Sequence, residues 1–388
     1  MESARLPQLV EVPIVPSTMR IKDQKRALIR RYAHADNGRG WYEALTTLVP
    51  IALLWWAAAW GNGVSRWLTA AAMVLLMLFT IRVLVLMHEC GHASLFRSRR
   101  LNRIVGFVLG VFAGMPQYVW SQHHDYHHAN NGNWEKFRGP LTTPSVDEYI
   151  AMGAKKRRMY RYTRTVWLAP LGGFVYLVFN PRFTWIKGTL GLLAHLLKSK
   201  VARPTVSLRE HAARYTSRYW KSSKEYRHMT WNNLVLLGVW ALMCWAVGAG
   251  LFFTVYLISV SMAGGVGIAL FTVQHNFEHS YATDTARWDY DSGAAEGTSY
   301  LVLPGWLNWF TANIGYHHVH HLSARIPSYR LAQCHEEYRE MFTKITRIKL
   351  SEIHHAFQCL LWDARAQRII SFAEFHDLYE IGPPAGAA

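Results

Sequence analysis

The sequence predicts an all-α integral membrane protein, in which four transmembrane helices form two hairpins and a cytosolic helical cap carries clusters of histidine. Three observations lead to this fold class. The 388 residues are 51% hydrophobic, and the apolar residues gather in four runs that are long enough to cross a bilayer. The 17 Trp residues are typical of membrane interfaces. The formal charge of +17 falls mostly outside the apolar runs, as expected for cytosolic segments.

The four apolar runs pair into two hairpins. The first pair is 44–60 and 66–87, which the sequence GNG at 61–63 separates. The second pair is 229–248 and 251–273, which meet at an uncharged glycine turn. A helix needs about 20 apolar residues to cross the bilayer core, so each run can span the membrane once. The turns of both hairpins therefore face the side opposite to the basic segments.

Weaker apolar stretches lie in the basic segment between the hairpins. Because they contain Gly or Pro or are short, we expect interfacial or re-entrant helices, and not full spans, at 104–120, 166–179 and 183–197. The chain accordingly divides into three parts, which are a cytosolic N-terminal arm at 1–42, a membrane domain at 43–325 and a cytosolic C-terminal helical region at 326–388.

The excess of Lys and Arg bears on location and partners. No basic nucleic-acid-binding motif accompanies the charge, so we expect contact with anionic membrane lipid and no nucleic acid. The positive-inside rule places the N-terminal arm, the central segment, the C-terminal region and all histidine clusters in the cytosol. A multi-pass protein of the bacterial inner membrane fits this pattern better than one of the endoplasmic reticulum. The four cysteines form no CxxC pair and indicate no disulfide framework.

Twelve of the 20 histidines fall in four clusters. In GYHHVHHL, residues 315–322, three histidines are spaced i, i+3 and i+4, which places their rings on one face of a helix. HHDYHH repeats this spacing, and HECGH and QHNFEH each hold a pair spaced i, i+4. Imidazole suits zinc, copper, iron and nickel. The candidate metal ligands are His88, His92, His124, His127, His128, His275, His279, His317, His320 and His321.

The number of histidines bears on which metal they bind. A closed structural zinc site uses four ligands, whereas these clusters offer at least nine imidazoles, enough for two metal ions with open positions. An all-histidine set at the membrane surface suits iron that activates O2. Glu89 and Glu278 lie inside clusters and are either acceptors for imidazole N–H groups or solvated carboxylates. A metal transporter or sensor is the alternative class, but its histidines would be expected near the bilayer midplane.

The clusters resemble the histidine boxes of the membrane fatty acid desaturases, which read H-x(3,4)-H once and H-x-x-H-H twice. The matching residues are His88 and His92, then His124, His127 and His128, then His317, His320 and His321, with His275 as the additional histidine after the fourth span. The resemblance covers residues 80–372 and includes Arg82, Trp120 and the stretches 141–149, 313–329 and 360–372.

The resemblance implies a di-iron enzyme, with two Fe ions and O2 as co-substrate, that introduces a double bond into a fatty acyl chain. It also implies an electron-donor protein, such as a ferredoxin or a cytochrome b5-like carrier, because the sequence has no dinucleotide-binding fingerprint. Acyl hydroxylation, or decarboxylation of a free fatty acid to a terminal alkene, is an alternative reaction on the same scaffold.

Some residues depart from the family pattern or have two interpretations. His123 and His318 are additional imidazoles, either of which could replace a neighbour as a ligand. His279 stands where many relatives carry an acidic residue, and its role as a tenth ligand or a supporting group is open. Arg82 lies inside a predicted span, roughly 9 Å from His88 along the helix axis at about 1.5 Å per residue. We expect its side chain to snorkel to the interface, the alternative being a functional charge.

Overall fold

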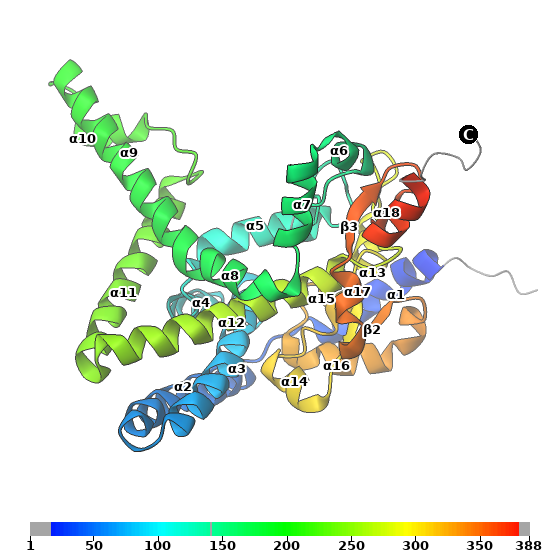
Figure 1. Cartoon of the computed structure of the whole chain (residues 1–388), viewed down its shortest axis with the longest axis horizontal. Coiled ribbons are helices and arrows are strands. Elements are labelled where there is room, and N and C mark those ends of the chain that lie inside the picture. The colour runs from blue at the N-terminus through cyan, green and yellow to red at the C-terminus, as the bar shows by residue number, and fades with distance from the viewer. Residues whose placement is uncertain (1–16, 140–141, 380–388) are drawn as a thin grey trace, which may run out of the picture.

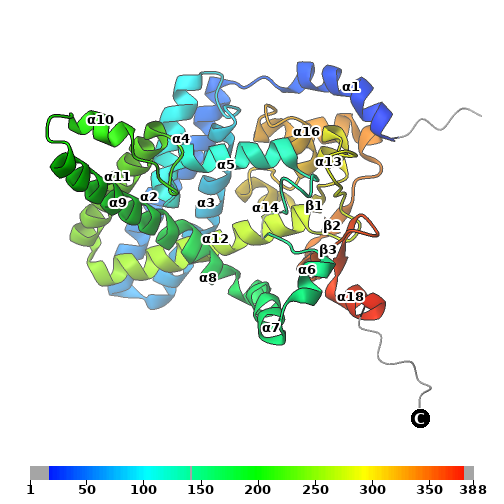
Figure 2. The same cartoon turned by 90° about the horizontal axis from the view of Figure 1, so that it is seen from above.

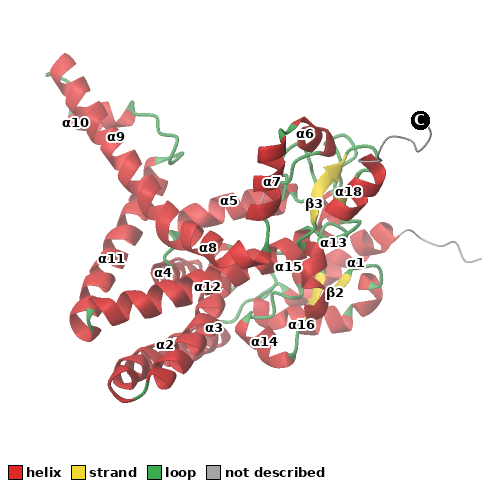
Figure 3. Ribbon diagram, viewed as in Figure 1, coloured by secondary structure: helices red, strands yellow, loops and turns green. Residues whose placement is uncertain are grey.

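The computed structural model describes residues 17–139 and 142–379, and it confirms an all-α membrane protein with only short strands. Helices make up most of the molecule, as Figure 3 shows. Four helices are long and apolar enough to cross a membrane, and they are α2 (Asn37–Val64), α3 (Arg66–Gly91), α11 (Ser223–Val247) and α12 (Ala249–His275). They form the two hairpins α2–α3 and α11–α12 (Figure 1).

The spanning helices extend beyond the predicted apolar runs because polar residues continue them. The side chain of Asp36 caps α2 by accepting a hydrogen bond from the Arg39 amide at 2.7 Å, so the helix begins before the apolar run does. In the second hairpin Gly248 has φ +85°, a conformation that glycine adopts readily, and this turn joins α11 to α12.

The two hairpins contribute one inner and one outer helix each. In their most apolar segments α3 and α12 are 56% and 44% buried, whereas α2 and α11 are 28% and 17% buried. Leu76, Val83 and Leu86 of α3 share one hydrophobic core with Phe252 and Val260 of α12. The inner helices therefore build the core, and the outer helices present Leu and Trp side chains to the surroundings.

A sharply bent pair of helices follows the first hairpin. Helix α4 (Arg99–Ala113) ends at Gly114, which has φ +73°, and α5 (Gln117–Asn130) begins after Pro116. The axes of α4 and α5 differ by 99°, so the pair is either a broken span or a re-entrant element. This region contains the stretch 104–120, for which the sequence predicts an interfacial or re-entrant helix.

The central segment forms a series of helices. It contains α6 (Val146–Ala151), α7 (Ala154–Thr163), η1 (Val166–Leu168), α8 (Ala169–Gly173), the π-helix η2 (Phe174–Phe179), α9 (Asn180–Ala202) and α10 (Leu208–Ala213). Helix α8 packs closely against α12. A Cβ atom added to Gly173 would lie only 2.3 Å from the Ser261 carbonyl oxygen, so glycine is needed at this contact. Helices α9 and α10 project away from the rest of the molecule (Figure 1).

The remaining elements form the cap. They are α1 (Ser17–Tyr32), α13 (Tyr290–Ala295), β1 (Tyr300–Val302), α14 (Gly305–Phe310), α15 (His317–Leu322), α16 (Ser328–Glu337), η3 (Arg339–Phe342), β2 (Arg347–Lys349), η4 (Leu350–Glu352), α17 (Ile353–Ala356), β3 (Cys359–Asp363), β4 (Arg368–Ser371) and α18 (Phe372–Tyr379). Strands β1 and β2 pair in parallel, and β3 and β4 form an antiparallel pair.

The C-terminal region, for which the sequence predicts a helical region from residue 326 onward, contains strands as well as helices. Leu361 and Ile370 are fully buried in the β3–β4 pair, where they pack with Tyr149 and Phe375. All five residues of β3 are buried, and β-branched and aromatic side chains such as those of Ile370 and Trp362 favour a strand in such a packed environment.

The N-terminal arm is part of the cap. Leu28 is fully buried and joins Val319, Ile326 and Leu331 in one hydrophobic core, so residues on both sides of the predicted boundary at 325/326 pack together. Figure 2 shows α1 beside α13 and α16. An ion pair between Lys25 and Asp291, at 2.5 Å, connects α1 to α13. Residues 1–16 of the predicted arm lie outside the described residues.

Candidate metal centre

Four helices bring the histidine clusters together. His88 lies in the last turn of α3, and His275 is the last residue of α12. The second box lies on α5 and the third box forms most of α15. Because α3 and α12 are neighbours, their ends meet on one side of the membrane-spanning helices, and α5 and α15 cover them there.

The histidines form two groups. In each group every residue offers one ring nitrogen, and these nitrogens all lie within 4.8 Å of one another. Group A contains His88, His92, His124, His128 and His320, and group B contains His127, His275, His317 and His321. All nine are predicted ligands, and the side chains of all nine are largely buried. The structure therefore arranges nine of the ten predicted ligands into two adjacent candidate metal sites.

The nitrogen distances within each group are those of ligands that point at one ion. In group A the Nε2 atom of His128 lies 3.0 Å from Nε2 of His124 and 3.0 Å from Nε2 of His320. In group B the Nε2 atoms of His317 and His275 are 2.9 Å apart. Two nitrogens bound at ~2.1 Å and at right angles to each other would be about 3 Å apart.

Hydrogen bonds alone do not satisfy this arrangement. A neutral imidazole nitrogen carries either one hydrogen or one lone pair, yet Nε2 of His128 faces two other Nε2 atoms. Group A also leaves the buried Nε2 of His92 without a hydrogen-bond partner in the described part of the chain. Buried polar groups are normally paired, so the donor set fits bound cations.

The protonation of the third box suits metal binding. Burial lowers the pKa of His317, His320 and His321 well below the usual value for histidine. For each ring, neighbouring histidines lower the pKa further. These imidazoles are therefore neutral near pH 7, and neutral imidazole is the form that binds a metal.

Acceptor groups around the histidines fix their orientation. Glu89 is fully buried, and its Oε1 lies 3.3 Å from Nδ1 of His88. Its Oε2 accepts hydrogen bonds from the hydroxyl of Ser94 at 2.9 Å and the amide of Ser328 at 2.8 Å. In group B, Nδ1 of His275 donates to the Gly297 carbonyl at 3.3 Å. Glu89 therefore occupies the position of an N–H acceptor, one of its two interpretations from the sequence.

Asp125 was not singled out in the sequence. Its Oδ1 lies 3.4 Å from Nδ1 of His92, and its side chain is half exposed. The available signal was its position directly after His124 in HHDYHH. A carboxylate at this distance can hold the His92 ring with Nε2 toward the other members of group A.

His279 lies outside both groups. Helix α12 ends at His275, so the i, i+4 relation between the two residues does not place both rings on one face. The His279 backbone has φ +62°, and its side chain is 67% exposed and 3.6 Å from that of Glu278, which is equally exposed. Neither Glu278 nor His279 therefore contacts the candidate metal sites.

The other two additional histidines also point away from the groups. His123 is exposed on α5. His318 is buried on the opposite face of α15, where its Nε2 lies 2.8 Å from Nδ1 of His335 and its ring packs on Phe342. Neither histidine replaces a neighbour in group A or group B.

Comparison with known proteins identifies the family. The sequence matches the family described as "Fatty acid desaturase" over residues 65–349, which is most of the chain. The chain belongs to the fatty acid desaturase family. It is similar to a fatty acid desaturase of Bacillus subtilis (strain 168), with 30% identity over 92% of each chain.

More distant desaturases are also similar to this chain. The sn-1 oleoyl-lipid 12-desaturase of Anabaena variabilis is 21% identical, covering 83% of this chain and 82% of the relative. The sn-1 acyl-lipid omega-3 desaturase (ferredoxin) of Synechocystis sp. is 24% identical, covering 71% of this chain and 68% of the relative. The family and these relatives support an oxidoreductase that acts in fatty acid desaturation.

Aromatic side chains in this desaturase pack directly on the histidines. The Trp120 ring stacks on His124, with centroids 4.5 Å apart and planes 16° apart. Phe271 of α12 meets His127 and His275 edge to face, each at 5.0 Å. These rings restrict the histidine rotamers and make one side of the centre apolar.

Arg82 is buried, and the expectation that it snorkels to the interface is wrong. It is 1% exposed and forms an ion pair with Glu43 of α2. Its Nε donates to the Thr47 hydroxyl at 3.0 Å, and another guanidinium nitrogen donates to the Trp309 carbonyl. The guanidinium also lies 3.9 Å from the centroid of the Trp309 ring. Pairing inside the protein removes the need to reach water, and Arg82 connects α2, α3 and α14.

An apolar cavity of about 110 Å3 lies among the spanning helices of this desaturase. Leu76 and Val83 of α3, Phe112 of α4, Trp240 of α11 and Phe252 of α12 contribute to its walls. Val83 is five residues before His88 on α3, or about 7.5 Å along the helix axis. Of the α3 residues that line the cavity, Val83 is the one nearest to His88 along the helix.

Proposed function

We propose that this protein is an oxygen-dependent fatty acyl desaturase that holds two iron ions with nine histidines. Group A would hold one ion through His88, His92, His124, His128 and His320, and group B the other through His127, His275, His317 and His321. The convergence of these nitrogens into two adjacent groups is the observation that carries the proposal. Two irons there would supply the reduction of O2 and the removal of two hydrogens from adjacent methylene carbons.

The protein's own residues position the reactants. Glu89, Asp125 and the Gly297 carbonyl orient imidazole rings, so the nitrogens remain convergent. Trp120 and Phe271 present apolar surface beside the histidines and exclude water. The apolar cavity between the spanning helices is suited to the methyl end of an acyl chain, which is held in register beside the metals.

An electron-donor protein is part of the proposal. A basic cytosolic face favours an acidic carrier such as a ferredoxin or a cytochrome b5-like protein. The name of the Synechocystis relative includes ferredoxin, which supports the first of these. We place the protein in the bacterial inner membrane with its histidine groups in the cytosol, because the basic segments precede and follow the spans on that side.

The alternatives have less support. For decarboxylation, the sequence offers Arg82 as the cation within a span that would hold the substrate carboxylate, and Arg82 is paired with Glu43. A metal transporter would place histidines near the bilayer midplane, whereas His88 and His275 lie at the ends of α3 and α12. Acyl hydroxylation would use the same two histidine groups, A and B, and would differ from desaturation only in its product.

The test is expression in a host that lacks fatty acid desaturation, with analysis of lipids and headspace gas by gas chromatography. New monounsaturated acyl chains under air, absent under nitrogen, are the expected result. Metal analysis of the purified protein should give two irons per chain. A terminal alkene one carbon shorter than the fed acid, a hydroxylated chain, or a single zinc in active protein would each contradict the proposal.

A further inference from the structure

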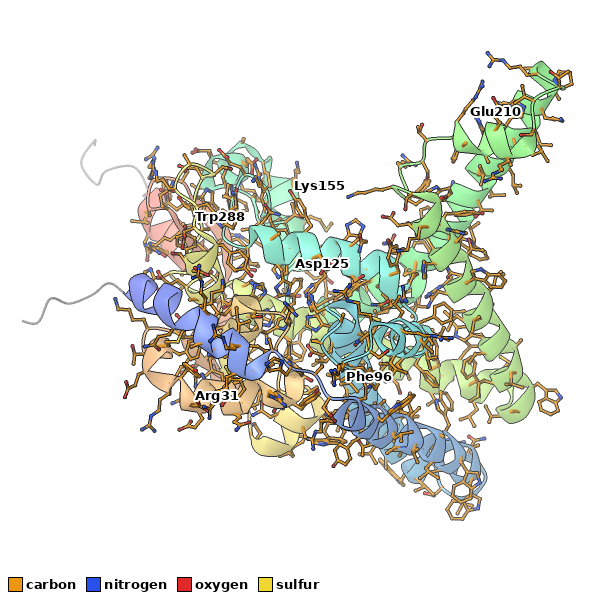
Figure 4. The ribbon with its side chains drawn as sticks, turned by 180° about the vertical axis from the view of Figure 1, so that it is seen from behind. Arg31, Phe96, Asp125, Lys155, Glu210 and Trp288 are labelled. Carbon is orange, nitrogen blue, oxygen red and sulfur yellow. The ribbon has the colours of Figure 1, made fainter. Side chains whose placement is uncertain are left out.

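A second cleft opens beside group A on the cap side of the molecule. Its volume is about 710 Å3, and His92 is part of its lining. One wall is formed by residues 33–35, which connect α1 to α2. Another is the turn after α3, which contains Phe96 and Arg97 and leads into Arg99 at the start of α4. Arg325, which precedes α16, completes the lining. Figure 4 shows Phe96 near the start of α2 and Asp125 on α5 above it.

Three arginines, Arg97, Arg99 and Arg325, are the charged side chains that line this cleft. The side chains of His34 and His92, which can titrate, also line it. All three arginines are exposed, and within the described residues none has an ion pair or a side-chain hydrogen bond. Arg138, in contrast, is paired with Glu148 at 2.7 Å. The cleft therefore concentrates uncompensated positive charge in a concave site.

Two carboxylates beside lining residues of the cleft have partners of their own. Asp36 follows the lining residue Ala35, and its Oδ1 accepts the Arg39 amide hydrogen at 2.7 Å as the cap of α2. Asp125 lies 3.4 Å from Nδ1 of His92. Neither residue lines the cleft, so an anion entering it meets three guanidinium groups before it meets a carboxylate.

The cleft lies where a spanning helix begins. Trp41 and Tyr42 are exposed in the first turns of α2, a position typical of aromatic residues at a membrane interface. Helix α4, which starts with Arg99, exposes Ile104, Val108 and Phe112 along one face. This i, i+4, i+8 stripe is suited to contact with lipid. The three arginines are therefore at the depth of lipid phosphates.

We propose that Arg97, Arg99 and Arg325 bind the phosphate group of the acyl donor at the mouth of this cleft. The inference rests on the proposed function and adds a subsite for the polar end of the substrate. Guanidinium groups form paired, charge-assisted hydrogen bonds with phosphate oxygens, and a concave arrangement of three suits one phosphate better than a protein surface. The phosphate belongs either to a membrane phospholipid or to a soluble acyl carrier such as a coenzyme A thioester.

The first experiment measures binding with the metal-loaded, full-length protein in detergent. The variants Arg97→Gln/Arg325→Gln and Arg99→Gln are compared with Arg158→Gln, which removes an exposed arginine on α7 outside the cleft. The probes are dihexanoylphosphatidylcholine, dihexanoylglycerol, which lacks the phosphate, and palmitoyl-coenzyme A. Isothermal titration calorimetry gives the affinity of each probe for each variant.

We expect the double variant to bind one phosphate-bearing probe about tenfold more weakly, with unchanged affinity for dihexanoylglycerol. If only the affinity for the phospholipid falls, the bound phosphate belongs to a lipid headgroup. If only the affinity for the coenzyme A thioester falls, it belongs to a soluble carrier. The variant Arg158→Gln should bind all probes as the parent does. Unchanged affinity of the cleft variants for both phosphate-bearing probes would overturn the proposal.

A kinetic experiment separates substrate binding from docking of an acidic electron donor. With electrons supplied by a small chemical reductant, the cleft variants should raise KM for the acyl lipid severalfold and leave kcat nearly unchanged. A defect seen only with a protein donor, together with intact phosphate binding, would assign the cleft to that donor instead. If the parent protein makes no double bond but the variants still lose phosphate binding, the desaturase proposal fails and the phosphate subsite stands.

Discussion

Neighbouring histidines in the two H-x-x-H-H boxes belong to different metal groups. His127 and His320 are each directly followed by a histidine of the other group, whereas the pairs His124/His128 and His317/His321, four residues apart, each stay in one group. Consecutive side chains on a helix differ by about 100°, and side chains four apart lie on one face. Each box therefore contributes to both candidate sites, and its spacing lets one helix supply histidines to both groups.

The variant His320→Ala tests the ligand assignment, with His279→Ala as the matched control. Removing a group A imidazole should lower the iron content from two toward one per chain and reduce desaturation at least about a hundredfold. Membrane insertion should persist, because the spanning helices do not depend on this ring. His279→Ala should retain both irons and full activity, since its ring is exposed and outside both groups. Metal analysis and product formation are measured on the same preparations. An equal loss of iron and activity in both variants would contradict the assignment of His320 as a ligand and of His279 as a residue outside both groups.

The buried pair of Arg82 and Glu43 is a second test at the scale of single residues. Arg82→Met leaves Glu43 buried with only Arg39, at 2.8 Å, as partner, so we expect a loss of about 3 kcal/mol. Glu43→Leu should cost a similar amount, and the double variant less than the sum of the two. Thermal unfolding midpoints in detergent give the comparison, with Arg158→Gln as the neutral control. Additive effects would show that the two side chains act independently.

At the scale of elements, the molecule depends on a close contact between α8 and α12. Besides the Ser261 oxygen, a Cβ on Gly173 would lie 2.5 Å from the Gly265 nitrogen. Two glycines facing each other let the backbones approach, as small residues commonly do between helices in membranes. This contact fixes α8 and the π-helix η2 against the inner helix that ends at His275. Packing in the membrane therefore supports the position of a group B ligand.

The pair Gly173→Ala and Gly267→Ala tests this contact. A methyl group at Gly173 must push α8 away from α12, so we expect a loss of about 1–3 kcal/mol and lower iron content. The same change at Gly267 of α12 meets open space and should be neutral or slightly stabilising, since Ala favours helix over Gly. Thermal unfolding and metal analysis separate the outcomes. Equal behaviour of the two variants would contradict a role for the close contact.

For the whole molecule, helix α1 at the start of the described chain and helix α16 after the third box lie on the histidine side. Helix α1 and helix α16 share the core that contains Leu28 and Leu331, and α15 of the third box belongs to the same core. The ends of α3 and α12 reach this side, so the hairpin turns near Ser65 and Gly248 are at the other end of the spans. The arrangement agrees with two hairpins that enter and leave the membrane from one side.

Cysteine labelling tests this topology. In a Cys244→Ser background, Ser65→Cys and Ala249→Cys should react with a membrane-impermeant maleimide added outside intact cells. Lys155→Cys, exposed on α7, should react only after the cells are opened. The other three cysteines are buried and should stay unlabelled. Labelling of Lys155→Cys from outside would rule out the four-span arrangement.

Local patterns in the sequence determined a large part of this protein. The apolar runs predict four spans, and the histidine spacings identify nine residues that the structure gathers into two groups. Both are short-range properties, because a span and a helical face depend only on residues close in sequence. Once the spans are assigned, the positions of Lys and Arg likewise predict the orientation without reference to contacts between distant segments.

Only the tertiary structure decided how the histidines divide and which residues support them. His279 has the same i, i+4 spacing from His275 as His92 has from His88, but α12 ends before it. Arg82 is paired because Glu43 lies on a neighbouring helix, and strand β2 forms because β1, far earlier in the chain, offers a partner. Where a helix ends, and which charge or strand finds a partner, depends on packing between segments far apart in the chain, which no local pattern contains.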